Sequence, residues 1–204
     1  MPSLLSLNNR YAGLFYTAKQ IGHHFIKSKY YIECFSGLAR TAKFSRSEIM
    51  VLNDISQFAN KKCKKLFPDA IITNTDFIEC IKKYNFEDSF FLIDPVWRID
   101  FYTFKNNFKE KYGNYNYKFN KDWHNETSKT NRKPAKQYLK ELEEILPTIK
   151  GTYIVTLEAN KKIKSPYSKL VIHTHSRLFG HKPKTMMFSN KPLEIQPPQI
   201  IDYT

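Results

Sequence analysis

The feature that most constrains the fold of this chain is the alternation of short apolar runs with helical stretches over its first half. Each run is apolar on both faces and bounded by polar residues, as expected of a buried parallel strand. Strands that alternate with helices in this way predict an α/β doubly wound fold. The predicted strands are residues 30–35, 49–53, 70–74 and 89–93, and the predicted helices are residues 14–26, 57–66 and 77–84.

The second half of the chain predicts one more helix and three more strands. An amphipathic helix is expected at residues 134–146, since Pro134 suits a first helical turn and Pro147 would end the helix. The last two strands are expected to form an antiparallel hairpin around Gly180, which completes a mostly parallel, seven-stranded sheet. The predicted strands are 152–157, 169–175 and 184–189, within a single domain over residues 1–204.

The charge balance of the chain favours a polyanionic partner. Thirty-three Lys and Arg residues against 19 Asp and Glu residues give a net charge of +14. Such an excess suits nucleic acid first and an anionic membrane second, although a lysine-rich solvated surface would also explain it. Cys34, Cys63 and Cys80 have no paired spacing, which indicates reduced, buried thiols. With neither a signal peptide nor an apolar run of membrane-spanning length, a soluble cytoplasmic protein is expected.

Acidic residues and one glycine follow the predicted parallel strands. Gly37, Asp54, Asp76 and Asp94 each come after a different strand. Ligands of doubly wound sheets bind beyond the carboxyl ends of the strands, so these residues are expected to line one edge. Gly37 allows a tight turn, and Asp54, 17 residues later, is near the spacing at which an acid binds a ribose diol. Asp76 is suited to accept a hydrogen bond from an adenine amino group, but Asp54 and Asp76 could also be simple helix N-terminal acids.

The sequence from Asp94 to Trp97 (DPVW) is suited to holding a flat base. The Asp94 carboxylate and the Pro95 carbonyl can both accept hydrogen bonds from an exocyclic amino group. Trp97 offers a stacking face, a contact worth roughly 1–3 kcal/mol per base. The alternative is an ordinary turn after a strand, with a buried tryptophan.

With these residues in order, the chain resembles the Dam-like family of DNA adenine methyltransferases. Residues 10–13 (RYAG) and 31–37 (YIECFSG) resemble the cofactor motifs of that family, and residues 53–55 (NDI) and 76–77 (DF) resemble its later cofactor steps. Residues 94–97 take the place of its D-P-P-Y/W catalytic motif. The resemblance implies S-adenosylmethionine as the cofactor and adenine as the target base. It assigns Tyr11, Gly13, Phe35, Gly37, Asp54, Asp76 and Phe77 to the cofactor pocket, and Asp94, Pro95 and Trp97 to catalysis.

The chain departs from this family at several positions. Leu14 and Phe15 follow Gly13, where the family has Gly-Lys, and Cys34 and Val96 replace prolines. The 17 residues between Asp76 and Asp94 leave no room for a target-recognition domain. These differences keep a second hypothesis open, in which a catalytically degenerate protein of this fold binds nucleic acid or serves as a partner subunit, as a homodimer or with a different chain.

The segment after the catalytic motif is the predicted nucleic-acid contact, within a basic, aromatic insertion and helix over residues 98–150. Residues 98–140 hold 11 basic and 4 acidic residues, so their net charge is 11 − 4 = +7. Basic groups can neutralise phosphates while the interleaved aromatic rings stack on exposed bases. A target base in a duplex would have to be flipped out of the helix. The candidate contacts with DNA or RNA are Arg98, Lys105, Lys118, Lys121, Trp123, Arg132 and Lys133.

Other kinds of site are disfavoured by the sequence. His173, His175 and His181 lie close together, but no Cys or acid completes a metal-ligand set, so no metal is expected. A nicotinamide-dependent oxidoreductase would share the predicted sheet, but its G-x-G-x-x-G loop is missing.

Overall fold

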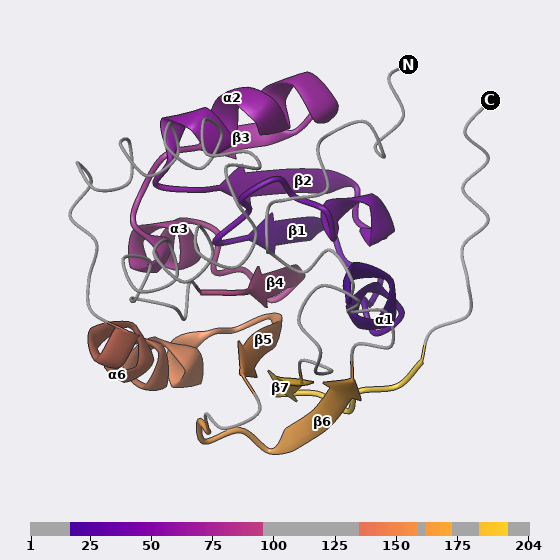
Figure 1. The fold of residues 1–204 in the computed structure, drawn as a ribbon, viewed down its shortest axis with the longest axis vertical. Coiled ribbons are helices and arrows are strands. Elements are labelled where there is room, and N and C mark those ends of the chain that lie inside the picture. Colours follow the sequence, from indigo (N-terminus) through magenta and orange to yellow (C-terminus); the bar gives the residue numbers. More distant parts are fainter. Residues whose placement is uncertain (1–16, 96–134, 159–161, 173–183, 196–204) are drawn as a thin grey trace, which may run out of the picture.

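In the computed structural model of the chain, the described residues are 17–95, 135–158, 162–172 and 184–195. Within them, seven strands form one sheet in the order β3-β2-β1-β4-β5-β7-β6, which runs from top to bottom in Figure 1. β1 to β5 are parallel, and β7 is antiparallel to both of its neighbours. The strands are β1 (Tyr30–Glu33), β2 (Ile49–Asn53), β3 (Ile71–Thr73), β4 (Ser89–Ile93), β5 (Thr152–Glu158), β6 (Tyr167–Ile172) and β7 (Lys184–Ser189).

The sheet confirms the predicted α/β fold class, a doubly wound, mostly parallel seven-stranded sheet with antiparallel C-terminal strands. Every predicted strand is present, and the bounds differ by at most two residues where the structure describes both ends. β6 begins two residues before its predicted start, and the turn around Gly180 lies outside the described residues. Buried parallel strands are continuous apolar runs, which explains why the sequence located them well.

Helices cover both faces of the sheet (Figure 1). α3 (Phe77–Lys83) and α6 (Ala135–Ile145) pack on the face that carries Ile32 and Phe91. α1 (Ala18–Gly22) and α2 (Gln57–Leu66) pack on the face that carries Tyr31 and Phe90. Two short 3-10 helices, η2 (Ala42–Phe44) and η3 (Leu146–Thr148), complete the described elements.

The ends of the helices follow from local sequence. Ser56 caps α2, since its hydroxyl accepts a hydrogen bond from the backbone N–H of Ala59 at 3.2 Å. The prediction that a helix extends to residue 26 is wrong, because α1 ends at Gly22. Gly22 has a low helix propensity. Backbone hydrogen bonds there span three residues instead of the four of an α-helix, as in the 3.1 Å bond from Phe25 N–H to the Gly22 carbonyl. The apolar periodicity nevertheless continues, since Phe25 is fully buried.

Two further expectations concern the described part of the chain. Cys34, Cys63 and Cys80 are free and buried, as predicted. None of the helices in the described ranges has the length and hydrophobicity that crossing a bilayer requires.

Candidate functional site

The carboxyl ends of β1, β2 and β4 meet at one edge of the sheet because these strands are parallel neighbours. Three acidic residues lie there: Glu33 ends β1, Asp54 follows β2 and Asp94 follows β4. We call Glu33, Asp54 and Asp94 the acidic rim. Burial raises the pKa of Glu33 most, and the negative charges of Asp94 and Asp54 raise it further, which places both aspartates within electrostatic reach of Glu33. The rim borders the point where the strand order reverses between β1 and β4, the usual ligand position in such sheets.

A turn at Gly37, in the loop after β1, contacts the acidic rim at Asp54. Gly37 has a φ of 51°, a left-handed conformation that glycine adopts without strain. Its backbone N–H donates a 2.8 Å hydrogen bond to Asp54 Oδ2, and the preceding Ser36 N–H donates to the Asn53 carbonyl at 2.8 Å. The loop after β1 is therefore bound to the end of β2, where the sequence predicted that Gly37 and Asp54 would meet.

Asp54 connects two loops. Besides the bond from Gly37, its Oδ1 accepts a 2.8 Å hydrogen bond from the backbone N–H of Ser56, the residue that caps α2. Its carboxylate thus holds the loop after β1 against the beginning of α2. The structure gives Asp54 this positioning role whether or not it also contacts a ligand.

Asp76 is the N-cap of α3. Its Oδ1 accepts a 3.0 Å hydrogen bond from the backbone N–H of Ile78, which compensates one of the unpaired donors of the first helical turn. The sequence left open whether Asp76 is a helix N-terminal acid or an adenine ligand, and the structure shows the first of these roles.

Asp94 lies at the end of β4 beside β5. Thr156 Oγ1 donates a 2.5 Å hydrogen bond to Asp94 Oδ1. Burial raises the pKa of Asp94 to about 7, although the bond from Thr156 lowers it. Asp94 therefore titrates near neutral pH, in the range where it can either accept or hold a proton. Pro95 next to it is buried, and Val96 and Trp97 lie outside the described residues.

Glu33 is a site residue that the sequence analysis missed. Its side chain is buried, and its carboxyl accepts hydrogen bonds from Tyr31 at 2.9 Å and Thr41 at 2.7 Å. Burial raises its pKa to about 8 against the effect of these two hydroxyl groups. An acid in the buried run 31–37 was the signal that could have identified it, because ionisable groups are rarely buried without a function.

Asn53 was also missed. Its buried amide nitrogen donates to the carbonyls of Cys34 and Thr75, both at 3.0 Å. Its amide oxygen accepts from the Thr73 hydroxyl at 2.8 Å and from the Thr75 backbone N–H at 3.1 Å. One side chain thus connects the ends of β1, β2 and β3 and sets the spacing of the loops at the rim.

Three aromatic rings from the loop after β1, α3 and α6 pack together. Phe35, Phe77 and Tyr138 form a cluster in which the ring centroids are 5.1–5.9 Å apart. Phe77 is buried in the core between α3 and the sheet, whereas Phe35 is half-buried. Of the two predicted cofactor aromatics within the described residues, Phe35 is therefore the one with more exposed surface.

The remaining predicted site residues lie outside the described residues. These are Tyr11, Gly13, Trp97, Arg98, Lys105, Lys118, Lys121, Trp123, Arg132 and Lys133. In the described ranges, no group of three or more His, Cys, Asp or Glu side chains is arranged to hold a metal ion.

Comparison with known proteins finds similarity in structure only. No family model and no curated protein matches the sequence. An rRNA methylase from Streptococcus thermophilus is 7% identical with a TM-score of 0.48, over 85% of this chain and 94% of that one. A methyltransferase candidate from Streptococcus mutans in complex with SAH is 10% identical with a TM-score of 0.47, over 84% and 94%. The protein 1320 of Thermoplasma acidophilum is 10% identical with a TM-score of 0.48, over 80% of this chain and 79% of that one.

Proposed function

We propose that this chain is a methyltransferase that uses S-adenosylmethionine to methylate the exocyclic amino group of adenine in DNA, or alternatively in RNA. The observation that carries the proposal is the position of Asp94 and Pro95, at the end of β4, beside Glu33 and across from the glycine turn. The strand order and the D-P-x-W sequence support the same reaction.

The residues of the rim fit a cationic cofactor. Glu33 and Asp94 both have raised pKa values, because burial disfavours their charged forms. A positive charge placed beside them would offset this effect and favour the carboxylates. When bound, S-adenosylmethionine supplies a methyl group on a positively charged sulfonium. The turn at Gly37 and the exposed part of Phe35 would hold the adenosyl group. Asp54 would bind the ribose hydroxyls, since a carboxylate offers more acceptor positions than the two that Gly37 and Ser56 use.

Asp94 and Pro95 would act on the target amine. The Asp94 carboxylate and the Pro95 carbonyl would each accept a hydrogen bond from one N–H of the amine, which concentrates lone-pair density on the nitrogen and fixes its direction. The nitrogen would bond to the methyl carbon as the carbon–sulfur bond breaks, which leaves the neutral thioether S-adenosylhomocysteine. The nitrogen would then lose one proton, for which Asp94 is a suitable acceptor because its pKa is about 7. Most of the rate acceleration would come from this positioning.

The proposed substrate is a nucleic acid because of the basic, aromatic segment after Asp94. Trp97 would stack on the target base, and Arg98, Lys105, Lys118, Lys121, Trp123, Arg132 and Lys133 would contact the phosphates and neighbouring bases.

Two measurements in sequence test the proposal. Calorimetry with S-adenosylmethionine should show binding, and transfer of a labelled methyl group to mixed DNA and RNA should follow, with the label recovered in N6-methyladenine. Asp94→Ala is the matched control, which should bind the cofactor and lose transfer. An absence of binding heat would favour the degenerate alternative that Val96 and Phe15 suggest. Binding without transfer to any substrate would rule out the proposed reaction for the isolated chain.

A further inference from the structure

A hydroxyl group occupies an otherwise apolar part of β5. Thr156 is fully buried, and its neighbours along the strand, Ile154, Val155 and Leu157, are at most 1% exposed. A buried hydroxyl without a partner is destabilising, and valine would fill the same space with a better strand propensity. Thr156 therefore has a polar group at a position where packing alone would favour an apolar one.

The hydroxyl of Thr156 is directed at Asp94. The register pairs Ile93 with Val155, so the next residues on the two strands are Asp94 and Thr156. Thr156 Oγ1 lies 2.5 Å from Asp94 Oδ1 and can only donate to it when Asp94 is ionised. Among the described residues, no other side chain donates to this carboxyl group.

The bond selects one oxygen of Asp94. With Oδ1 bound to Thr156, rotation of the carboxyl group is restricted, and Oδ2 is the oxygen available to a ligand. The other titratable group that faces Asp94 is Glu33 on β1, whose pKa the charge of Asp94 raises. The Thr156 hydroxyl favours the ionised form of Asp94, and the charge of Asp94 in turn disfavours ionisation of Glu33.

We propose that Thr156 is a positioning residue, which holds Oδ1 of Asp94 so that Oδ2 accepts the hydrogen bond from the substrate amine. This inference rests on the proposed function, and it adds a residue from β5 to a site that the sequence placed on β1 to β4.

The test compares Thr156→Val, which keeps the shape and removes the hydroxyl, with Thr156→Ser, which keeps the hydroxyl. In methyl transfer, Thr156→Val should lower kcat about 10–100-fold, the usual effect of losing a hydrogen bond to a charged group. The KM for S-adenosylmethionine should change little. The acid limb of the kcat profile should move to higher pH, because the bond that lowers the Asp94 pKa is lost. Thr156→Ser should restore both the rate and the profile.

A second readout does not depend on activity. The carboxyl carbon of Asp94 can be titrated by 13C NMR and assigned by its loss in Asp94→Ala. Its pKa should rise in Thr156→Val and return in Thr156→Ser. An unchanged Asp94 titration, or an unchanged kcat in an active Thr156→Val enzyme, would overturn the positioning role. If the wild-type protein transfers no methyl group, the proposed function fails instead, whatever the titration shows. Should Thr156→Val not fold, Thr156→Ala gives the same comparison.

Discussion

The acidic rim, in which Asp54 and Asp94 are half-buried, and the buried side chain of His24 differ in how their charges are balanced. His24 follows α1, and its Nε2 lies 3.3 Å from the Lys169 ammonium of β6. An ammonium can only donate, so Nε2 accepts and the proton of the neutral ring is on Nδ1, which donates to the Glu194 carbonyl at 2.8 Å. Burial and the charge of Lys169 lower the pKa of His24, so the form that burial favours is also the form that fits both partners.

In the acidic rim, the two preferences oppose each other. The hydroxyl donors of Tyr31, Thr41 and Thr156 fit ionised carboxylates, while burial favours the protonated forms of Glu33 and Asp94. The His24 contacts connect the segment after β7 to the body of the protein. Because the neutral form of His24 suits both burial and its two partners, a bound ligand would not make this network more stable. The rim leaves an unfavourable electrostatic balance that a cation would relieve, which is characteristic of sites selected for function rather than stability.

The two networks also act on stability with opposite signs. The pKa values of Glu33 and Asp94 are higher in the folded state than the ordinary values of 4.5 and 3.8, so the folded protein binds more protons above those values. Stability is therefore lost as pH rises from about 4 to about 8. The pKa of His24 is lower than 6.5 in the folded state, so its contribution is lost as pH falls below 6.5.

The largest expected effect is on catalysis at the rim. Asp94→Ala removes the proposed acceptor of the substrate amine and, under the proposed function, should lower methyl transfer about 10³-fold or more, by analogy with the loss of one oriented electrostatic group in other enzymes. The affinity for nucleic acid should stay close to wild type, since Asp94 carries no positive charge with which to bind phosphates. Single-turnover transfer and filter binding measure the two quantities. A proportional loss of methyl transfer and nucleic-acid affinity would mean that Asp94 supports the fold, as His24 does. The contrast between the acidic rim and His24 would then disappear.

Glu33→Gln should separate stability from function. The neutral amide avoids the cost of ionising a buried group, and the hydroxyl groups of Tyr31 and Thr41 can rotate to suit it. Each pKa unit corresponds to about 1.4 kcal/mol, so the variant should be more stable than wild type at pH 8 by on the order of a few kcal/mol. At pH 4.5 the difference should nearly vanish.

Urea unfolding at pH 4.5 and pH 8 measures this difference, and calorimetry measures cofactor affinity in parallel. We expect weaker binding of S-adenosylmethionine, because the carboxylate that offsets its charge is gone. A variant that is less stable at pH 8, with unchanged cofactor affinity, would show that Glu33 is a structural residue.

His24→Ala should show the reverse pattern. The loss of a buried hydrogen bond and of the packed ring should lower the free energy of unfolding by about 1–3 kcal/mol at pH 7.5. Methyl transfer at 25 °C should stay within about twofold of wild type, because a stable fold is the only requirement that His24 serves. The fall in stability below pH 6.5 should become shallower in this variant.

Lys169→Met is the matched variant for the charge. It removes the ammonium that lowers the pKa of His24, so proton NMR should show His24 titrating at higher pH than in wild type. If the His24 titration does not move, the contact with Lys169 does not contribute to its neutral state.

The sequence predicted the fold well and the site only in part, for physical reasons. Strands and caps depend on neighbouring residues, such as Ser56 before α2, so a single sequence reveals them. It also placed Asp54 and Asp94 at the correct strand ends. Their partners come from distant segments, since Thr156 is 62 residues from Asp94. The burial of Glu33 was indicated only by its place within an apolar run, and its hydrogen bond from Thr41 depends on how the loop after β1 folds.

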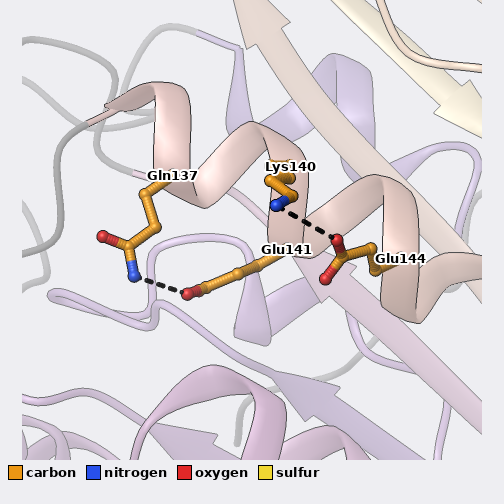
Figure 2. A network of polar contacts seen from close by, with 4 residues as sticks. All are labelled: Gln137, Lys140, Glu141 and Glu144. Carbon is orange, nitrogen blue, oxygen red and sulfur yellow. Dashed lines mark hydrogen bonds and ion pairs between the residues drawn. The ribbon is translucent and has the colours of Figure 1, made fainter.

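The smallest expected effect tests whether the acidic rim and the His24 contacts affect stability and methyl transfer because they are shielded from water. α6 carries two exposed polar pairs on its surface, Gln137 with Glu141 at 2.8 Å and Lys140 with Glu144 at 3.9 Å (Figure 2). The Lys140 and Glu144 side chains are 77% and 64% exposed, so water screens their attraction. Lys140→Gln should therefore change the free energy of unfolding by less than about 0.5 kcal/mol and leave methyl transfer unchanged. Urea unfolding at low and high salt measures this, with Glu144→Gln as the reciprocal control. A loss comparable to that of His24→Ala would mean that polar pairs stabilise this protein regardless of burial, and the contrast between the rim and His24 would need a different explanation.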